Sequence, residues 1–139
     1  MKKSMWFSGL FAFVVVLVLT APAMAQQDSF TIHVPFSFNV NAHVLPAGEY
    51  RIGIVVPGEV QIRGIDHIVN TFFAAPRVSR SLHGPLNAKL VFNCYGRQYF
   101  LSRVWFGNAG TGYELWVSNT EREYAQQIPK TDTELRAAK

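Results

Sequence analysis

The four histidines are the first side chains whose chemistry could support catalysis or metal binding. His33, His43, His67 and His83 do not form the His-x-His or His-x-x-x-His spacing that is typical of a metal site. Asp66 precedes His67 directly, but the side chains of adjacent residues in a strand point to opposite sides. Since the chain has no second cysteine, we expect no structural zinc site. We therefore expect no metal ion and no cofactor.

The sequence also contains little that supports catalysis by a nucleophile or by a pair of carboxylates. The chain has no Gly-x-Ser-x-Gly motif. Ser79, Ser81 and His83 are close together, but no carboxylate is identifiable that would orient the histidine. The acids that could form a glycosidase pair are Glu49, Glu59, Asp66 and Glu114. Because their spacing marks no two of them as partners, we expect a protein that is not an enzyme.

A glycine-rich segment, Gly107–Gly112, suggests a phosphate-binding loop. Such loops bind phosphate because the N-terminus of a helix follows them immediately. Here a strand is expected to follow, so we interpret the segment as a flexible hairpin loop.

Aromatic residues are the remaining candidates for a ligand-binding surface. Tyrosine and tryptophan rings could form a platform for sugars or apolar ligands, although cross-strand and core packing is their commoner use. The rings in question are Tyr95, Tyr99, Trp105, Tyr113 and Trp116. We take Tyr95, Tyr99 and Trp116 as the candidate ligand-binding residues, together with His33 on the polar face of the first expected strand.

The segment Leu90–Phe106 is expected to form a central β-hairpin that turns at Gly96-Arg97, where glycine allows a positive φ. The first strand would place Leu90, Phe92 and Cys94 on one face and Val91, Asn93 and Tyr95 on the other. The return strand would place Tyr99, Leu101 and Trp105 on one face and Phe100, Val104 and Phe106 on the other. Because both faces are largely apolar, we expect each to be covered, by a second sheet, the C-terminal helix or a partner.

The other strands follow from alternation and from turn residues. Phe30–Phe38 alternates between apolar and polar residues, and Pro35 places this strand at a sheet edge or at a bulge. Further strands are expected at Tyr50–Val56, Glu59–Arg63, Ile68–Ala74 and Tyr113–Val117, with Arg77–Asn87 as the longest loop. The pattern predicts a mainly β protein, a single antiparallel β-sandwich or small barrel with a short C-terminal helix.

The C-terminal helix is predicted by a capping box at Ser118-Asn119-Thr120-Glu121. It should run over 119–127 and end before Pro129. Residues 129–139 are expected to be a flexible tail, in which a second capping box, Thr131 to Glu134, could start one more helical turn.

The N-terminus has the three parts of a signal peptide. Lys2 and Lys3 precede an uncharged apolar run over 6–20, and Ala23-Met24-Ala25 forms a cleavage site. The apolar run is shorter than the roughly 20 residues that span a bilayer, which disfavours an uncleaved anchor. We expect a signal peptide at 1–25, a β-rich domain at 26–128 and the tail at 129–139. The mature chain would have no membrane span and would be periplasmic or extracellular.

The net charge and the single cysteine limit the kinds of partner and bond that we expect. The net charge is +4, and the arginines are scattered along the chain, so we expect no nucleic-acid partner. Cys94 is the only cysteine, which excludes an intramolecular disulfide. We interpret it as a small buried apolar residue. An intermolecular disulfide and a reactive thiol are the alternatives.

Four segments carry a resemblance to a known family. They are a Pro-Phe-x-Phe strand in VPFSF, a Leu-Pro-Ala-Gly-x-Tyr turn in LPAGEY, a Tyr-Gly…Tyr-Phe-Leu hairpin in YGRQYFL, and a Ser-x-x-Glu-Arg segment in SNTER. From Val34 to about Ala125 the chain resembles a family of small, uncharacterised secreted β-rich proteins of soil bacteria. The resemblance implies export and a single β-rich domain, and it implies no catalytic residues.

These observations favour an exported, non-catalytic binding or envelope-associated structural module. An exposed sheet edge could pair with another envelope protein by strand addition. A barrel-type carrier of a small apolar ligand is one alternative. A hydrolase with an unrecognised site is the other.

Overall fold

The computed structural model describes residues 28–75, 77–80, 87–107 and 110–137. The predicted signal peptide at 1–25 lies outside these ranges. So do 81–86 of the predicted long loop and two residues, 108–109, of the glycine-rich segment.

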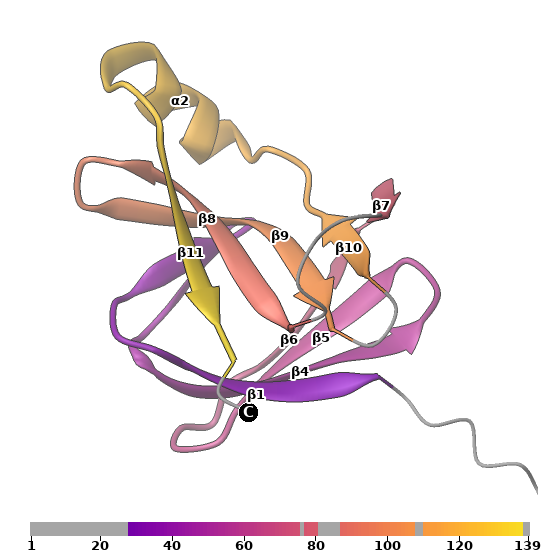
Figure 1. Ribbon diagram of the computed structural model, residues 1–139. Coiled ribbons are helices and arrows are strands. Elements are labelled where there is room, and N and C mark those ends of the chain that lie inside the picture. The colour runs from indigo at the N-terminus through magenta and orange to yellow at the C-terminus, as the bar shows by residue number, and fades with distance from the viewer. Residues whose placement is uncertain (1–27, 76, 81–86, 108–109, 138–139) are drawn as a thin grey trace, which may run out of the picture.

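Two β-sheets face each other in a sandwich-like arrangement, without a closed barrel (Figure 1). Sheet A has the strand order β1 (Ser29–Val34), β4 (Gly48–Val56), β5 (Glu59–Gly64), β6 (Asn70–Ala74). Sheet B has the order β11 (Thr131–Arg136), β8 (Lys89–Tyr95), β9 (Gln98–Phe106), β10 (Thr111–Glu114), β7 (Arg77–Arg80). Beside it, β2 (Phe38–Val40) pairs in parallel with β9 and antiparallel with β3 (His43–Leu45). The mainly β prediction is confirmed, and the sandwich is the alternative that forms.

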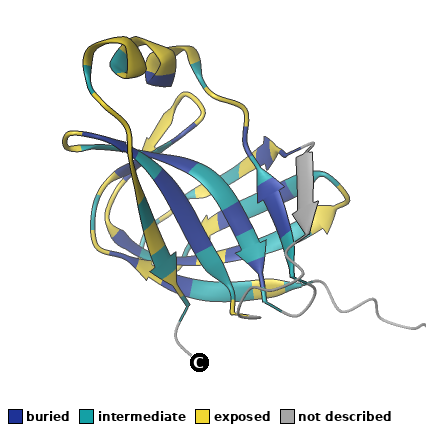
Figure 2. Cartoon of the chain, turned by 45° about the horizontal axis from the view of Figure 1, so that its top comes forward, coloured by how far each residue is buried: buried dark blue, intermediate teal, exposed yellow. Residues whose placement is uncertain are grey.

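The core lies between the two sheets. Its largest fully buried side chains include Tyr50 from β4, Phe38 from β2 and Phe92 from β8. Their rings meet edge to face around Phe38, with centroids 5.3 and 5.5 Å apart. Buried and more exposed residues alternate along most of β4 and β5 in sheet A, whereas β8 in sheet B has runs of three and two buried residues, dark blue in Figure 2. Aromatic burial of this kind stabilises a small domain that has no disulfide.

The central hairpin is confirmed as β8 and β9, with Gly96 at φ +63° in its turn. One detail of the prediction was wrong. A β-bulge at Ser102 makes Val91 pair with Arg103 while Phe92 pairs with Leu101. Because a bulge inserts one unpaired residue, side chains beyond it change face. Val104 and Phe106 therefore point into the core, while Trp105 lies on the outer face.

Both faces of the hairpin are covered near its tip. The ring of Phe36 covers Tyr99 on the inner face, and α2 (Asn119–Gln127) lies over the outer face at the tip. The ring of Tyr124 on this helix lies 5.8 Å from that of Phe100. The predicted cap is present, since the backbone N–H of Glu121 donates to the Ser118 hydroxyl over 3.1 Å. No helix in the described ranges is long and apolar enough to cross a membrane.

Three sequence expectations about extended segments need correction. Residues 129–139 were expected to form a flexible tail, but Thr131–Arg136 pairs with β8 as strand β11, so the second capping box starts no helical turn. Part of the expected long loop, Arg77–Arg80, is strand β7. The first strand ends at Val34 before Pro35, whose missing N–H cannot continue a ladder. Its predicted position at a sheet edge is confirmed, because β1 is the first strand of sheet A.

Candidate functional site

The four predicted ligand-binding residues do not come together in one place. Tyr95 and Tyr99 lie on opposite faces of the hairpin, because Tyr95 pairs with Gln98 and Tyr99 pairs with Cys94. Trp116 is 59% exposed and follows β10. His33 is exposed on β1, in the other sheet. The structure therefore shows no shared aromatic platform for these residues.

The two tyrosines have structural contacts instead. Tyr99 stacks on Phe36 with ring centroids 3.8 Å apart. Tyr95 is 4% exposed, and its hydroxyl donates to the Glu121 carboxylate over 3.3 Å. Burial raises the pKa of Tyr95 above its usual value, and the Glu121 carboxylate raises that pKa further.

Glu121 is the one buried charged residue in the described part of the chain. Besides the tyrosine hydroxyl, its Oε1 accepts a 2.7 Å hydrogen bond from Nδ2 of Asn93 on β8. A buried carboxylate with two side-chain donors joins α2 to the hairpin, which is a structural role. Sequence reasoning identified Glu121 as part of the cap but missed its contact with the hairpin, because that contact joins residues 28 positions apart.

Metal binding requires a cluster of histidine, cysteine or acidic side chains. The described residues contain no group of three or more His, Cys, Asp or Glu side chains that could hold an ion. Cys94 is buried, and its thiol lies 3.2 Å from the hydroxyl of Thr133 on β11. This agrees with the interpretation of Cys94 as a small core residue.

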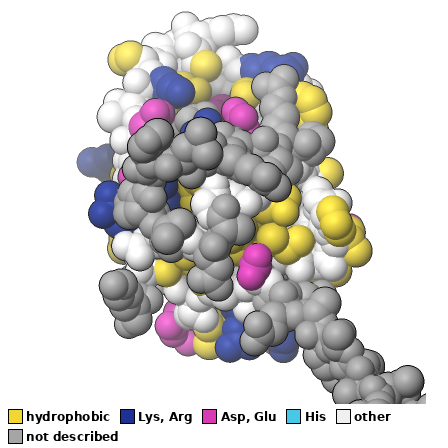
Figure 3. Space-filling model, turned by 45° about the vertical axis from the view of Figure 1, so that its right-hand side comes forward, with side chains coloured by type: hydrophobic (Ala, Val, Ile, Leu, Met, Phe, Trp, Pro, Cys, Tyr) yellow, Lys and Arg dark blue, Asp and Glu magenta, His cyan; other side chains and the backbone are white. Residues whose placement is uncertain are grey.

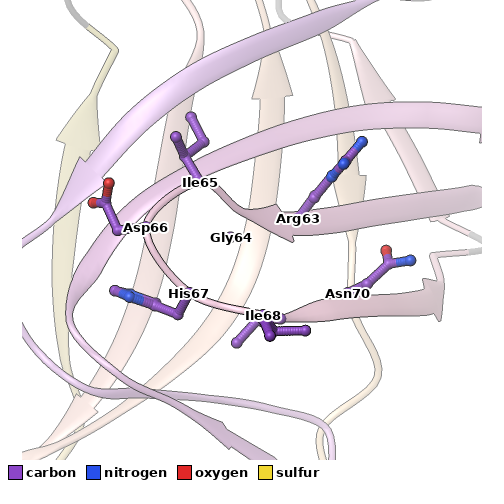
Figure 4. A pocket seen from close by; sticks show the side chains of 8 residues that line it. Arg63, Gly64, Ile65, Asp66, His67, Ile68 and Asn70 are labelled. Carbon is purple, nitrogen blue, oxygen red and sulfur yellow. The ribbon is translucent and has the colours of Figure 1, made fainter.

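His67 lies in the loop between β5 and β6, which surrounds a surface pocket of about 590 Å³ lined by 63–70 (Figure 4). Its ring lies over Gly48, where a Cβ would overlap it, and 6.0 Å from the ring of Tyr50. The Nε2 atom is buried without a hydrogen-bond partner. The packing on Gly48 and Tyr50 identifies His67 as a residue that closes the end of the core.

On the outer face of sheet B, Lys89 and Arg103 have partners within the protein. Lys89 forms a 2.9 Å ion pair with Glu134, and Arg103 lies 3.9 Å from Glu114. Both cations also lie about 6 Å from the ring of Trp105. Their charges are thus already compensated. On the side of the molecule shown in Figure 3, basic side chains lie at several separate places rather than in one stripe.

The outer face of sheet A carries two arginines on neighbouring strands. Four residues form one row across its strands, because Thr31 pairs with Arg51, Arg51 with Arg63 and Arg63 with Asn70. Both arginines are exposed, and they stand directly opposite each other on β4 and β5. Among the described residues, neither guanidinium forms an ion pair or a hydrogen bond. Like charges in directly opposed positions destabilise a sheet.

A second row lies beside the first. It consists of Ser29, Gly53, Gln61 and Phe72, paired in that order across the four strands. We call these two rows together the arginine face. It is bordered by His33 and Glu49, which pair with each other on β1 and β4. One of the four predicted residues, His33, therefore lies beside the candidate site.

Two shallow depressions flank the arginine pair. One, of about 230 Å³, lies over Gly53 and is lined by Arg51, Arg63, Gln61 and Ser29 among others. The other, of about 250 Å³, lies between the arginines and the start of the β5–β6 loop at Gly64 and Ile65. Glycine at position 53 leaves room beside both guanidinium groups. Figure 4 shows Arg63 and Asn70 next to each other on β5 and β6.

The two guanidinium groups are suited to contact with an anion. Each guanidinium carries five N–H donors in a planar fork that matches the oxygens of carboxylate, sulfate or phosphate. Two forks on neighbouring strands can contact one anionic group from two sides.

No protein-family model, curated protein or solved structure matches this chain.

Proposed function

We propose that the protein is an exported, non-catalytic binding module that holds an anionic group on the arginine face. Export is supported by the basic start, the apolar run and the Ala23-Met24-Ala25 motif of the sequence. The binding role is supported by one observation above all, the opposed and uncompensated pair Arg51 and Arg63.

The energetics of the pair favour an anion. Directly opposed like charges cost a sheet about 0.2–1 kcal/mol. An anion between the guanidinium groups replaces this repulsion with charge-assisted hydrogen bonds, which are worth about 1.5–3 kcal/mol each. The unliganded sheet therefore carries a small cost that ligand binding removes.

Glu49 limits where the anion can bind. It lies two residues from Arg51 on the same face of β4, and it forms no ion pair with that arginine. A carboxylate in that position repels an anion, so the ligand should approach from the opposite end of the pair. That end is the depression over Gly53.

Chemical-shift mapping tests the proposal. The ¹⁵N-labelled protein is titrated with citrate and with inorganic sulfate at constant ionic strength. We expect saturable shifts at the amides of 51–53 and 61–64, and a loss of affinity of about tenfold or more in Arg51→Gln and in Arg63→Gln. Arg97→Gln is the matched control, because Arg97 is exposed in the β8–β9 turn and its change removes the same charge. Shifts that persist in both face variants would refute the proposal.

Edge pairing is a second candidate function, favoured by the position of β1 at the edge of sheet A. A strand of an envelope protein could add to this edge through main-chain hydrogen bonds. Because charges on edge strands oppose such pairing, His33→Lys should abolish co-elution with an envelope extract. Thr120→Lys, on the exposed side of α2, should not. Equal co-elution of the two variants would exclude pairing at β1.

The barrel-type carrier and the hydrolase have less support. A barrel-type carrier requires a closed barrel, whereas the two sheets form a sandwich whose interior holds Phe38, Tyr50 and Phe92. No arrangement among the described residues favours the hydrolase.

A further inference from the structure

We infer that the anion bound by the arginine face is the carboxylate of an acidic saccharide, a uronate-containing chain that lies across the two rows. This inference rests on the proposed function and names its ligand class. The main support comes from the second row, which contains the amide of Gln61 and the ring of Phe72. A simple inorganic anion would need neither group.

The first observation is an amide pair beside the arginines. Nε2 of Gln61 donates to Oδ1 of Asn70 over 2.8 Å, from neighbouring strands β5 and β6. Each amide has a donor and an acceptor, so the pair retains one free NH₂ group and one free carbonyl oxygen. This remains true if both amides are flipped together. A fixed donor beside a fixed acceptor is suited to the hydroxyl groups of a sugar, which both donate and accept.

The second observation is an exposed aromatic ring in the same row. Phe72 pairs directly with Gln61 and is 48% exposed. The negative face of an aromatic ring attracts the slightly positive C–H groups on the flat side of a pyranose. Phe72 thus gives the face an apolar platform on β6, while Arg51 and Arg63 supply charge on β4 and β5.

The third observation is the size of the depression over Gly53. Its volume of about 230 Å³ lies below the ~300 Å³ at which pockets for whole small-molecule ligands begin. It can take a carboxylate and part of a ring, and the rest of the ligand must then lie on the open sheet. A chain of flat rings fits this shape better than a compact ligand does.

Other anionic partners fit these groups less well. A peptide added at an edge would use main-chain groups and would leave the amide pair without a role. Nucleic acid requires a longer basic surface than one arginine pair. Anionic lipid is the strongest competitor, because Ile65 and Ile68 in the neighbouring loop are exposed. It would not use Gln61 and Asn70, however, so lipid binding is an outcome that the test must separate.

Titration calorimetry provides the test, with the protein obtained by expression of the full chain. The probes are trigalacturonate, its fully methyl-esterified neutral form, inorganic sulfate, and vesicles of phosphatidylglycerol. We expect trigalacturonate to bind at least about tenfold more tightly than the neutral form. Phe72→Ala should weaken trigalacturonate about three- to tenfold, as expected for loss of an aromatic contact.

Control variants distinguish the face from general effects. Val44→Ala truncates another exposed apolar side chain, on β3, and should leave the affinity for trigalacturonate unchanged. Gln61→Ala should weaken binding of trigalacturonate more than binding of sulfate. Far-ultraviolet circular dichroism and melting temperature confirm that each variant is folded.

The outcomes separate this inference from the proposed function. If sulfate binds as tightly as trigalacturonate and Phe72→Ala has no effect, the saccharide inference is overturned while anion binding stands. Binding to the vesicles, with loss in Ile68→Ser and no binding of trigalacturonate, would assign the face to lipid and overturn the inference. If no anion binds, both proposals fail.

Discussion

Replacement of Glu121 should reveal how firmly α2 is held on the hairpin. In Glu121→Ala, Nδ2 of Asn93 and the hydroxyl of Tyr95 both lose their acceptor. A buried polar group left without a partner costs about 1–3 kcal/mol. Tyr95 is 4% exposed and bears this cost fully, whereas half-buried Asn93 can recover part of it from water. We expect a loss of about 2–4 kcal/mol in the free energy of unfolding.

A conservative change separates the hydrogen bonds from the charge. Glu121→Gln keeps an acceptor oxygen in the same position but loses charge assistance, so its cost should be about 1 kcal/mol. Glu123→Ala removes an exposed acid from the same helix and should change stability by less than about 0.5 kcal/mol. The three variants thus form a graded series.

Urea unfolding followed by tryptophan fluorescence measures the series, with circular dichroism as a second probe. The expected order of stability is wild type and Glu123→Ala, then Glu121→Gln, then Glu121→Ala. If Glu121→Ala matched Glu123→Ala within error, the buried hydrogen bonds would not hold α2 in place.

Three further predictions concern the arginine face and the buried tyrosine. A Cβ at Gly53 would meet Ser29 only in ordinary contact at 3.4 Å. Since glycine weakens a strand interior, Gly53→Thr should stabilise the protein by about 0.5–1 kcal/mol in urea unfolding. It should also weaken anion binding in calorimetry by filling the depression, and tighter binding would contradict the role of that space. Arg63→Gln should raise stability without ligand by about 0.2–1 kcal/mol, and the gain should shrink in 1 M salt as screening weakens the repulsion. Because burial and then Glu121 raise the pKa of Tyr95 above 10.0, its contribution to stability is present below pH 10 and is lost as the pH rises through the folded-state value. The wild type should therefore lose stability above pH 10 more steeply than Tyr95→Phe, and parallel pH profiles would exclude this cause.

The elements that were predicted correctly are those defined by residues within or next to the element itself. The helix at 119–127 was correct at both ends, because Ser118 caps it and the following Pro129 disfavours continuation. The hairpin at Gly96 was equally clear. In both cases the deciding residues lie within a few positions of the element that they define.

Strand β11 shows where this kind of inference fails. Its sequence, TDTELR, is polar and contains a capping-box pattern, so a frayed tail or a helical turn was the natural expectation. The structure turns Thr133 and Leu135 toward the core side of sheet B, opposite Phe92 and Leu90. That preference depends on the adjacent edge of β8, a partner about 40 positions away. Tertiary pairing therefore decided the outcome against local propensity.

The candidate site was missed for a related reason. The sequence showed Arg51 and Arg63 as two of several scattered arginines, and neither belongs to a motif. Their significance lies in the pairing of β4 with β5 and in the absence of an ion pair to either arginine among the described residues. Of the aromatic residues predicted to bind a ligand, Tyr95 and Tyr99 pack within the fold.

The register of β4 and β5 could nevertheless have been derived from the sequence. If Pro57-Gly58 forms a two-residue turn, uninterrupted pairing would place Arg51 opposite Gly64. It would also place odd-numbered residues of β4 opposite the buried Val60 and Ile62, and so would turn Arg51 into the core.

The buried apolar residues of β4, Tyr50 and Ile52, are even-numbered. One extra residue must therefore bulge out between the turn and Ile52, and the structure has this irregularity between Ile54 and Val56. A regular hairpin would have separated the two charges. The bulge reconciles a two-residue turn at Pro57-Gly58 with burial of the even-numbered residues of β4. The same bulge places Arg51 opposite Arg63. The proposed binding site is therefore a direct consequence of how this hairpin buries its core residues.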